Sequence, residues 1–442
     1  MEAVMKLRIG VLVVAVFILG MASNGFAAGF AIIEQSVKGL GTAFAGGAAV
    51  AEDPSTVYFN PAGMTRLEGH QVTGAVHFIM PSTKFKKKSA TNVAGADYTG
   101  GNGGEGGENA VVPNLYYTET FDNGWSFGLG INAPFGLATK YDSDWVGRYH
   151  AVESDMMTIN INPSAAYKVN DELSLGLGIS AQYIDATLSS MLDGGLLATG
   201  NPAASQANDI LAVMDADDWG YGYNFGLLYE FDKNTRAGLS YRSEVQQSLE
   251  GDVAFTPAGS IANQGVSGDI DLPASAQMSI YHQYNEKWSV MADIMWTDWS
   301  SFDKLVIKLD QGVPTASGTL TELVTTEDWD DSMRYSVGAT YRPNDTCILR
   351  MGVAYDETPI PDAHRTPRIP GTDRVWLALG AGHKRGNWNF DVGYVHLFVD
   401  DSSIDQQIAV AAPTDENFGR GNLSGEFENS VDIFSVEASY KF

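Results

Sequence analysis

Residues 221–231 read Tyr-Gly-Tyr-Asn-Phe-Gly-Leu-Leu-Tyr-Glu-Phe, so every second residue from Tyr221 to Phe231 is large and apolar. The residues between them are mostly small or polar. The same alternation recurs in residues 173–183 and 333–341. In a β-strand, a period of two places all the large apolar side chains on one face. These stretches predict amphipathic strands, which a soluble β-sandwich and a membrane β-barrel both contain.

The connections between the predicted strands decide between these two folds. Tight polar turns, such as 170–172 and 232–234, alternate with long stretches rich in Gly, Asp and Thr. The long stretches cover residues 89–108, 193–217, 256–268, 311–327 and 409–424. Short turns at one end, long loops at the other and aromatic residues near the strand ends are typical of outer-membrane barrels. We therefore predict an all-β protein, an antiparallel transmembrane β-barrel that occupies residues 69–442.

The number of predicted strands is even, as bacterial single-chain barrels require. We expect fourteen strands, near residues 69–83, 109–121, 124–138, 154–169, 172–191, 218–231, 235–255, 269–285, 287–309, 329–342, 346–357, 373–385, 387–407 and 425–442.

The composition excludes several other classes of protein. The 442 residues include 48 Gly, 20 Phe, 19 Tyr and 9 Trp, and the formal net charge is −27. Nucleic acid is not an expected partner, because phosphate binding needs clustered Lys and Arg. After the N-terminus no apolar run approaches the roughly 18 residues that a membrane-spanning helix needs. The single Cys347 excludes an intramolecular disulfide framework and a CxxC metal or redox site.

The sequence contains no recognisable catalytic or cofactor-binding motif. The seven His residues show neither HExxH nor a paired spacing, and no Ser-His-Asp arrangement is suggested. The Gly-rich stretch 39–48 has Phe44 where a dinucleotide-binding loop needs its third glycine. We expect no enzyme activity, no cofactor and no metal site. The acidic runs 215–218 and 327–331 are interpreted as solvated loop ends, with calcium binding as the alternative.

The N-terminus predicts export. Lys6 and Arg8 precede the apolar run from Ile9 to Leu19, and small residues follow up to Ala28. A short basic region, an apolar core and a small-residue exit describe a secretory signal peptide, and we place it at residues 1–27. A barrel that is exported in this way belongs in the outer membrane of a Gram-negative cell.

The C-terminus supports the same location. The chain ends on Phe442, and reading back by twos gives Tyr440, Ala438, Val436 and Phe434. A last strand with a terminal Phe and an apolar outer face resembles the signal by which barrels are recognised for insertion into the outer membrane. The barrel-insertion machinery is therefore an expected partner.

Residues 28–68 do not fit the barrel pattern. They have no period-two run and are rich in Gly and Ala. A lumen enclosed by fourteen strands would otherwise be an open aqueous pore. We predict that this segment is an N-terminal hatch that plugs the lumen. Within it, Asn60 can cap a short helix that begins at Pro61.

Several motifs resemble the FadL family of outer-membrane transporters for long-chain fatty acids and other hydrophobic compounds, including aromatic hydrocarbons. The resemblance spans the mature chain, in order, through residues 28–30, 39–46, 53–64, 133–139, 241–244, 296–300, 355–359 and 369–374. It implies a fourteen-strand barrel, a hatch and diffusion-driven uptake. It also implies that Asn60, Pro61 and Ala62 match the hatch motif of the family and that Phe30 reaches the ligand pocket.

A lateral opening is predicted in the third strand. Pro134 removes one N–H from the ladder and Gly136 follows two residues later, a combination that marks a bulge or kink. The family resemblance implies that the third strand is kinked here and that solute leaves through the gap. We assign the opening to Ala133, Pro134, Phe135 and Gly136.

We expect uptake of hydrophobic compounds, primarily long-chain fatty acids. Solute would be captured in the extracellular loops, move to an apolar lumen pocket, and diffuse past the hatch or through the lateral opening. Fatty-acid members of the family tend to offer a base in the fifth strand, where this chain has Asp185 and no base. The alternatives are aromatic or aliphatic hydrocarbon uptake by the same route, a general porin, or a surface adhesin.

The basic run 84–88 is the densest positive charge in this acidic chain. If the last strand ends at the periplasmic side, the antiparallel first strand delivers the run to the outer rim, at the height of the lipopolysaccharide phosphates. We expect lipopolysaccharide to contact Lys84, Lys86, Lys87 and Lys88, each worth about 1 kcal/mol near a negative membrane surface. A solvated loop start is the alternative.

Overall fold

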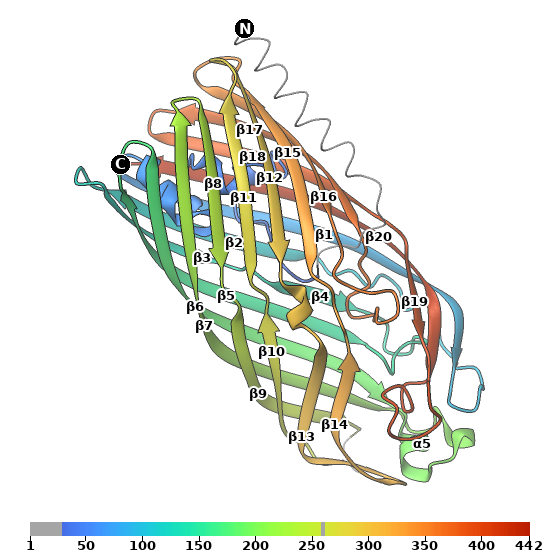
Figure 1. The fold of residues 1–442 in the computed structure, drawn as a ribbon. Coiled ribbons are helices and arrows are strands. Elements are labelled where there is room, and N and C mark those ends of the chain that lie inside the picture. The colour runs from blue at the N-terminus through green and yellow to red at the C-terminus, as the bar shows by residue number, and fades with distance from the viewer. Residues whose placement is uncertain (1–28, 258–260) are drawn as a thin grey trace.

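The computed structural model describes residues 29–257 and 261–442, and in them one antiparallel sheet closes on itself as a barrel (Figure 1). The predicted signal peptide, residues 1–27, lies outside this range. The sheet has twenty strand segments: β1 (His70–Thr91), β2 (Ala110–Thr120), β3 (Trp125–Asn132), β4 (Gly136–Lys140), β5 (Glu153–Lys168), β6 (Leu173–Leu192), β7 (Ile210–Asp232), β8 (Thr235–Arg242), β9 (Val245–Thr256), β10 (Gln264–Leu272), β11 (Ser275–Gln283), β12 (Trp288–Thr297), β13 (Lys304–Thr315), β14 (Gly318–Thr326), β15 (Ser332–Tyr341), β16 (Cys347–Asp356), β17 (Arg374–Arg385), β18 (Trp388–Val399), β19 (Ser402–Gln406) and β20 (Asn422–Lys441).

These segments form fourteen strands, the number predicted from the sequence, because six of the fourteen are interrupted once. The interrupted strands are β3/β4, β8/β9, β10/β11, β12/β13, β14/β15 and β18/β19. Neighbours in the chain pair antiparallel, and β1 closes the barrel on β20 from Gln71↔Lys441 to Thr91↔Asn422. The prediction of a fourteen-stranded antiparallel barrel is confirmed.

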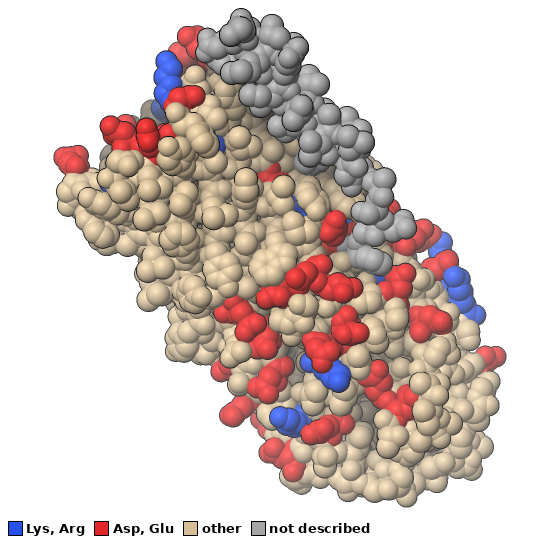
Figure 2. All heavy atoms as spheres, viewed as in Figure 1, with Lys and Arg blue, Asp and Glu red and all other residues tan. Residues whose placement is uncertain are grey.

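Along each strand, the apolar residues of the alternating pattern lie on the outward face of the wall. In β7 the Tyr221 side chain is 75% exposed, whereas Leu228 points inward and is fully buried. In β20, Phe434 and Val436 are exposed and Ile433 is buried. On the face shown in Figure 2, a broad band almost free of charge crosses the strands, and Asp and Glu gather between this band and the long loops. An apolar belt of this kind suits the hydrocarbon of a membrane.

Beyond the apolar band the predicted strand limits were wrong. Residues 311–327, predicted as a loop, form most of a hairpin in which β13 and β14 pair as far as Thr315↔Gly318. β7 begins at Ile210 instead of near residue 218, and β1 continues to Thr91 instead of ending near 83. The strands continue to pair beyond the part of the wall that lipid covers. Because the outward side chains there need not be apolar, the sequence lacks the alternation by which strands are recognised.

The N-terminal segment, residues 29–69, lies within the barrel (Figure 1). Its helical turns are α2 (Val37–Leu40), α3 (Gly47–Val50), α4 (Thr56–Phe59) and η1 (Pro61–Arg66). α2 contacts β17, β18 and β20, α3 contacts β8 and β11, and η1 contacts β5, β6 and β7. The segment therefore packs against strands around the barrel.

The remaining helical turns lie elsewhere: α5 (Gly194–Thr199) and η2 (Pro202–Ala204) between β6 and β7, and η3 (Trp299–Ser301) between β12 and β13. Among the described residues, the helices are all too short or too polar to cross a membrane.

Candidate ligand pathway and hatch

Asn60 caps η1 as predicted and also fixes it to the wall. Its Oδ1 accepts a hydrogen bond from the Ala62 amide at 3.0 Å, and Pro61 is the first residue of the turn. The Asn60 side-chain amide donates to the carbonyls of Ala48, at 2.6 Å, and of Leu227 in β7, at 2.9 Å. One buried side chain therefore joins α3, η1 and the barrel, a link that the sequence did not predict.

Three arginines of the wall hold backbone carbonyls of the N-terminal segment. Arg236 donates to the carbonyls of Ala49 and Val50, both at 2.6 Å, at the C-terminal end of α3. The other two bonds run from Arg334 to the Ala43 carbonyl, at 2.9 Å, and from Arg242 to the Tyr58 carbonyl, at 3.0 Å. The segment is thus anchored from several strands. None of these arginines was given a role from the sequence, although Arg242 lies in the motif 241–244.

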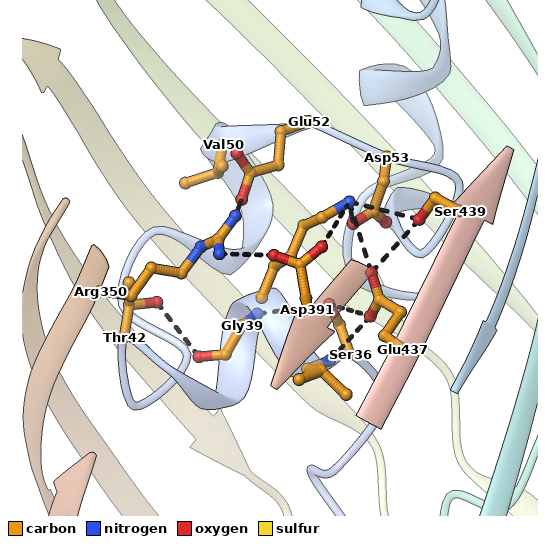
Figure 3. Close-up of polar contacts among 12 residues, drawn as sticks. Ser36, Gly39, Thr42, Val50, Glu52, Asp53, Arg350, Asp391, Glu437 and Ser439 are labelled. Carbon is orange, nitrogen blue, oxygen red and sulfur yellow. Dashed lines mark hydrogen bonds and ion pairs between the residues drawn. The ribbon is translucent and has the colours of Figure 1, made fainter. Parts of the chain in front are cut away.

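A buried ionic cluster adds a further anchor (Figure 3). The Lys38 ammonium in α2 lies 2.8 Å from Asp53 and 3.3 Å from Glu437 in β20. Arg350 in β16 pairs at 2.7 Å with Asp391, which also lies 3.8 Å from Lys38, and at 3.2 Å with Glu52. Two cations from the segment and the wall thus hold three buried carboxylates and that of Glu52, which is exposed. The buried charges depend on one another for compensation.

The other end of the segment enters a cluster of aromatic rings. The ring centroid of Phe30 lies 4.7 Å from that of Trp299, 5.7 Å from Trp329, 5.8 Å from Phe302 and 6.1 Å from Phe135. Phe30 is buried. The structure therefore brings Phe30 and Phe135, both predicted to belong to the pathway, into direct contact.

The wall is interrupted beside this cluster, where the sequence predicted a kink. Residues 133–135 separate β3 from β4, and β4 pairs with β5 only. The last pair between β2 and β3 is Leu115↔Ile131. Residues 110–114 of β2 consequently pair with β1 on one side and with no described strand on the other. An isolated bridge, Gly107↔Thr139, bounds the gap at the side of the long loops.

The N-terminal segment takes the position of a strand at this gap. The Ile32 amide donates to the Pro134 carbonyl at 2.8 Å, and the Gly136 amide donates to the Phe30 carbonyl at 3.0 Å. Pro113 lies across the gap in β2. Prolines on both edges lack the N–H that would extend the ladder. Pro134 was predicted from the sequence to break the ladder, whereas Pro113 was not.

An apolar cavity of about 630 Å³ adjoins the gap. Its lining includes Phe30, Val111, Pro113, Phe135, Leu137 and Trp299. The four residues assigned to the lateral opening lie in order along its edge, and three of them line the cavity: Ala133, Phe135 and Gly136.

A second cavity, of about 960 Å³, lies among the long loops, between α5, the β13–β14 hairpin and residues 413–420. Its apolar lining includes Leu192, Leu197, Leu305, Leu320, Leu323 and Phe418. Both volumes fall in the range of about 300–1,000 Å³ that is usual for small-molecule sites. Arg368 lines this cavity and Ile369, the next residue, lines the first one.

The lysine run lies within β1 and is largely paired. Lys88 is 2.6 Å from Glu426, Lys86 forms an ion pair with Glu428, and Lys84 is 3.9 Å from Glu105. The Lys87 ammonium donates to the Tyr98 carbonyl at 3.4 Å. The interpretation as a solvated loop start is wrong, because the strand continues to Thr91. Contact with lipopolysaccharide stays a prediction.

The acidic runs do not converge on one point. Residues 215–218 lie within β7. Glu327, between β14 and β15, is buried and accepts a hydrogen bond from Trp329 Nε1 at 3.0 Å. Burial raises the pKa of Glu327 to about 8. In the described part of the chain no group of three or more His, Cys, Asp or Glu residues is arranged to hold a metal ion.

Comparison with known protein families identifies relatives of this chain. The family described as outer membrane protein transport protein (OMPP1/FadL/TodX) matches residues 18–442. The chain belongs to this family. The long-chain fatty acid transport protein of Escherichia coli O6:H1 is 30% identical to it over 97% of both chains. A putative outer membrane protein of Neisseria meningitidis serogroup B is 30% identical over 95% of this chain and 96% of its own.

Solved structures of FadL relatives agree with the fold. A Pseudomonas aeruginosa FadL homologue superposes with a TM-score of 0.84, at 26% identity, over 94% of this chain and 100% of its own. The Pseudomonas putida toluene transporter TodX shares the fold, with a TM-score of 0.68 at 18% identity over 94% and 100%. The predicted resemblance to the FadL family and the predicted outer-membrane location are confirmed.

Proposed function

We propose that this protein takes up hydrophobic compounds across the outer membrane, primarily long-chain fatty acids. The observation that carries the proposal is the interrupted wall between β2 and β4, with an apolar cavity and the Phe30 ring beside it. A membrane wall normally pairs every backbone group, because an unpaired group in hydrocarbon costs free energy. A gap lined by apolar side chains suits a solute that leaves sideways into the membrane.

In this proposal the solute moves through the two cavities. Solute is captured in the 960 Å³ cavity among the loops, passes the aromatic cluster around Phe30, and reaches the 630 Å³ cavity at the gap. Relatives named long-chain fatty acid transport proteins support fatty acids as the substrate. The aromatic rings of the cluster, and the toluene transporters that share the fold, favour aromatic hydrocarbons as the second candidate.

Residues 28–68 act in this proposal as a hatch that closes the lumen to water. The buried anchors at Asn60, Arg236, Arg334 and Lys38 support this role. The Asn60-Pro61-Ala62 turn gives the hatch its shape. A shift of Phe30 on ligand binding would be transmitted to this turn along the chain between them. An open porin or an adhesin would have no need for a lumen filled in this way.

Two further partners belong to the proposal. The exposed aromatic and apolar face of β20, with Phe442 at its end, serves recognition by the barrel-insertion machinery. Lys84, Lys86, Lys87 and Lys88 lie at the rim of the long loops, where lipopolysaccharide phosphates can replace the carboxylate partners of Lys84, Lys86 and Lys88 and the Tyr98 carbonyl at Lys87.

A proline substitution tests the gap. Pro134→Ala supplies the missing N–H and frees the backbone, so residues 133–135 can join the ladder and narrow the opening. The matched control is Pro163→Ala, since Pro163 lies in the wall within β5 and outside the gap. Uptake of labelled palmitate by cells should fall several-fold for Pro134→Ala alone, at equal surface expression. Equal uptake by both variants would contradict release through this strand.

A further inference from the structure

Glu34 places a buried carboxyl group at the cavity beside the gap. It belongs to the N-terminal segment, of which residues 29–34 all line the 630 Å³ cavity, and it is 5% exposed. The buried carboxylates of Asp53 and Asp391 lie within 4.0 Å of Lys38. Among the described residues, Glu34 has no such ion pair, and the hydrogen bond to its carboxyl comes from its own backbone amide. An acid without a counter-ion in an apolar cavity is a candidate for a functional role.

The charged side chains that act on Glu34 lie on three neighbouring strands. Arg334 in β15, Asp356 in β16 and Arg374 in β17 line the same cavity. They are cross-strand neighbours, paired as Arg334↔Asp356 and Asp356↔Arg374. Asp356 also accepts a hydrogen bond from Trp376 Nε1 at 3.3 Å. Because two arginines flank one aspartate, this row stays positive beside Glu34 and attracts an anion that enters the cavity.

Burial keeps the Glu34 carboxyl partly protonated at neutral pH. Burial raises the pKa of Glu34 to about 7, although its own backbone amide and the two arginines of the row oppose the rise. Burial also raises the pKa of the nearby Tyr58 phenol above its ordinary value, so Tyr58 stays neutral. Glu108 and Asp155 line the cavity from exposed positions. Glu34 is therefore the buried group at this cavity that can gain and lose a proton near pH 7.

A fatty acid that leaves through the gap has to lose its charge. The gap opens onto hydrocarbon, where an ionised carboxylate is far less stable than in water and the neutral acid is tolerated. Two carboxyl groups that share one site hold a proton between them, because ionisation of both is unfavourable at short range. A substrate carboxylate beside the neutral Glu34 side chain meets this condition.

We infer that Glu34 gives its proton to the carboxylate of a long-chain fatty acid at the gap, so that the substrate enters the membrane as the neutral acid. The O–H bond of Glu34 breaks and an O–H bond forms on the substrate, which leaves Glu34 as a carboxylate. Hydronium from water that enters the cavity restores the Glu34 proton after the substrate has left. This inference rests on the proposed uptake function and adds a step that a neutral hydrocarbon does not need.

Uptake by cells tests this step with labelled palmitate and labelled hexadecanol, which share a chain length and differ in charge. Glu34→Gln keeps the size and polarity of the side chain and has no acidic proton. Palmitate uptake should fall at least about tenfold at pH 6, since a positioned acid speeds proton transfer by about 10²–10⁴-fold. Hexadecanol uptake should stay unchanged, and Glu34→Asp should retain part of the palmitate uptake. Glu68→Gln is the matched control, because Glu68 is exposed at the other end of the segment and pairs with Lys441.

The pH profile separates a proton donor from a residue that only packs. The neutral form of Glu34 gives the proton, and this form is present below the pKa of about 7 and lost above it. The ratio of wild-type to Glu34→Gln palmitate uptake should therefore be largest at pH 6 and approach one at pH 9. A ratio that does not change with pH would overturn the inference.

Carbon-13 NMR gives a measurement that needs no variant. The full wild-type chain in non-ionic detergent is titrated with pH in the presence of carboxyl-labelled palmitate. Two interacting carboxyl groups lose their protons in two macroscopic steps, so the resonance of the bound palmitate should shift in two steps. A single step would contradict a shared proton.

The remaining outcomes separate the two proposals. Wild-type palmitate uptake by the Glu34→Gln variant would overturn the proton transfer and leave the uptake function standing. An equal loss of palmitate and hexadecanol uptake, with a folded barrel by heat-modifiable gel mobility, would also overturn it, because the charge of the solute would then not matter. If wild-type cells take up neither compound faster than cells without the protein, the uptake function itself is contradicted.

Discussion

Replacing Lys38 by Met should release the N-terminal segment from the wall. The Lys38 ammonium lies within 4.0 Å of Asp53, Asp391 and Glu437, and its side chain is 7% exposed. Without it, Arg350 alone remains to compensate three buried carboxylates, those of Asp53, Asp391 and Glu437. Breaking a buried ion pair by removing one partner costs about 3–5 kcal/mol. Since every 1.4 kcal/mol is a factor of ten, the closed position of the hatch should lose about two to three and a half orders of magnitude of preference.

Planar-bilayer recording measures this change directly. Wild-type protein should show rare, brief openings, and Lys38→Met should show frequent ones. Lys441→Met is the control, because its ion pair with Glu68, at 2.7 Å, is exposed and such pairs contribute about 0–1 kcal/mol. Adding Glu437→Gln to Lys38→Met should lower the conductance again, because one unpaired charge is removed. A folded Lys38→Met barrel with wild-type conductance would refute the role of the cluster.

The same cluster predicts how the closed state responds to pH. Burial alone would lower the pKa of Lys38, but Asp53, Glu437 and Asp391 raise it above its ordinary value. Burial alone would raise the pKa of Asp53, but Lys38 lowers it below its ordinary value. A lysine whose pKa is raised in the folded state stabilises that state until the pH rises through the raised pKa. An aspartate whose pKa is lowered in the folded state stabilises that state until the pH falls through the lowered pKa. The Lys38–Asp53 pair should therefore stay charged between about pH 5 and 9, so titration of this pair should not change the conductance in that range.

Three further predictions concern the hatch, the loops and the outer rim. Deleting residues 28–68 should raise conductance sharply while the barrel still folds; an unchanged conductance would refute the plug. Because the pKa of Glu327 is raised to about 8 by burial, the folded loop around it loses stability as the pH rises from about 4.5 to 8. Proteolysis of this loop should increase from pH 6 to pH 9 in wild-type protein and not in Glu327→Gln. Replacing Lys84, Lys86, Lys87 and Lys88 by Gln should reduce lipopolysaccharide co-purification with nearly unchanged thermal stability, and full retention would leave the run without this role.

The sequence alone determined the fold class and the strand number, because both depend on short-range order. A period of two in the side chains specifies which face meets lipid, as Tyr221 and Leu228 show, and tight polar turns mark one end of each hairpin. The cap of η1 is equally local, since Asn60 acts on a residue two positions away. The kink at Pro134 could be predicted because proline lacks the N–H that the strand ladder needs at that same position.

Only the tertiary structure determined the contacts inside the barrel. Lys38 meets Glu437 across 399 positions of the chain, and Arg368 and Arg420 line one cavity because two separate loops fold over it. Such contacts depend on the register of every intervening strand and on the closure of β1 on β20, which no local pattern encodes. The gap has the same origin: Pro113 and Pro134 each remove an N–H locally, but only strand pairing sets them on opposite edges of one opening.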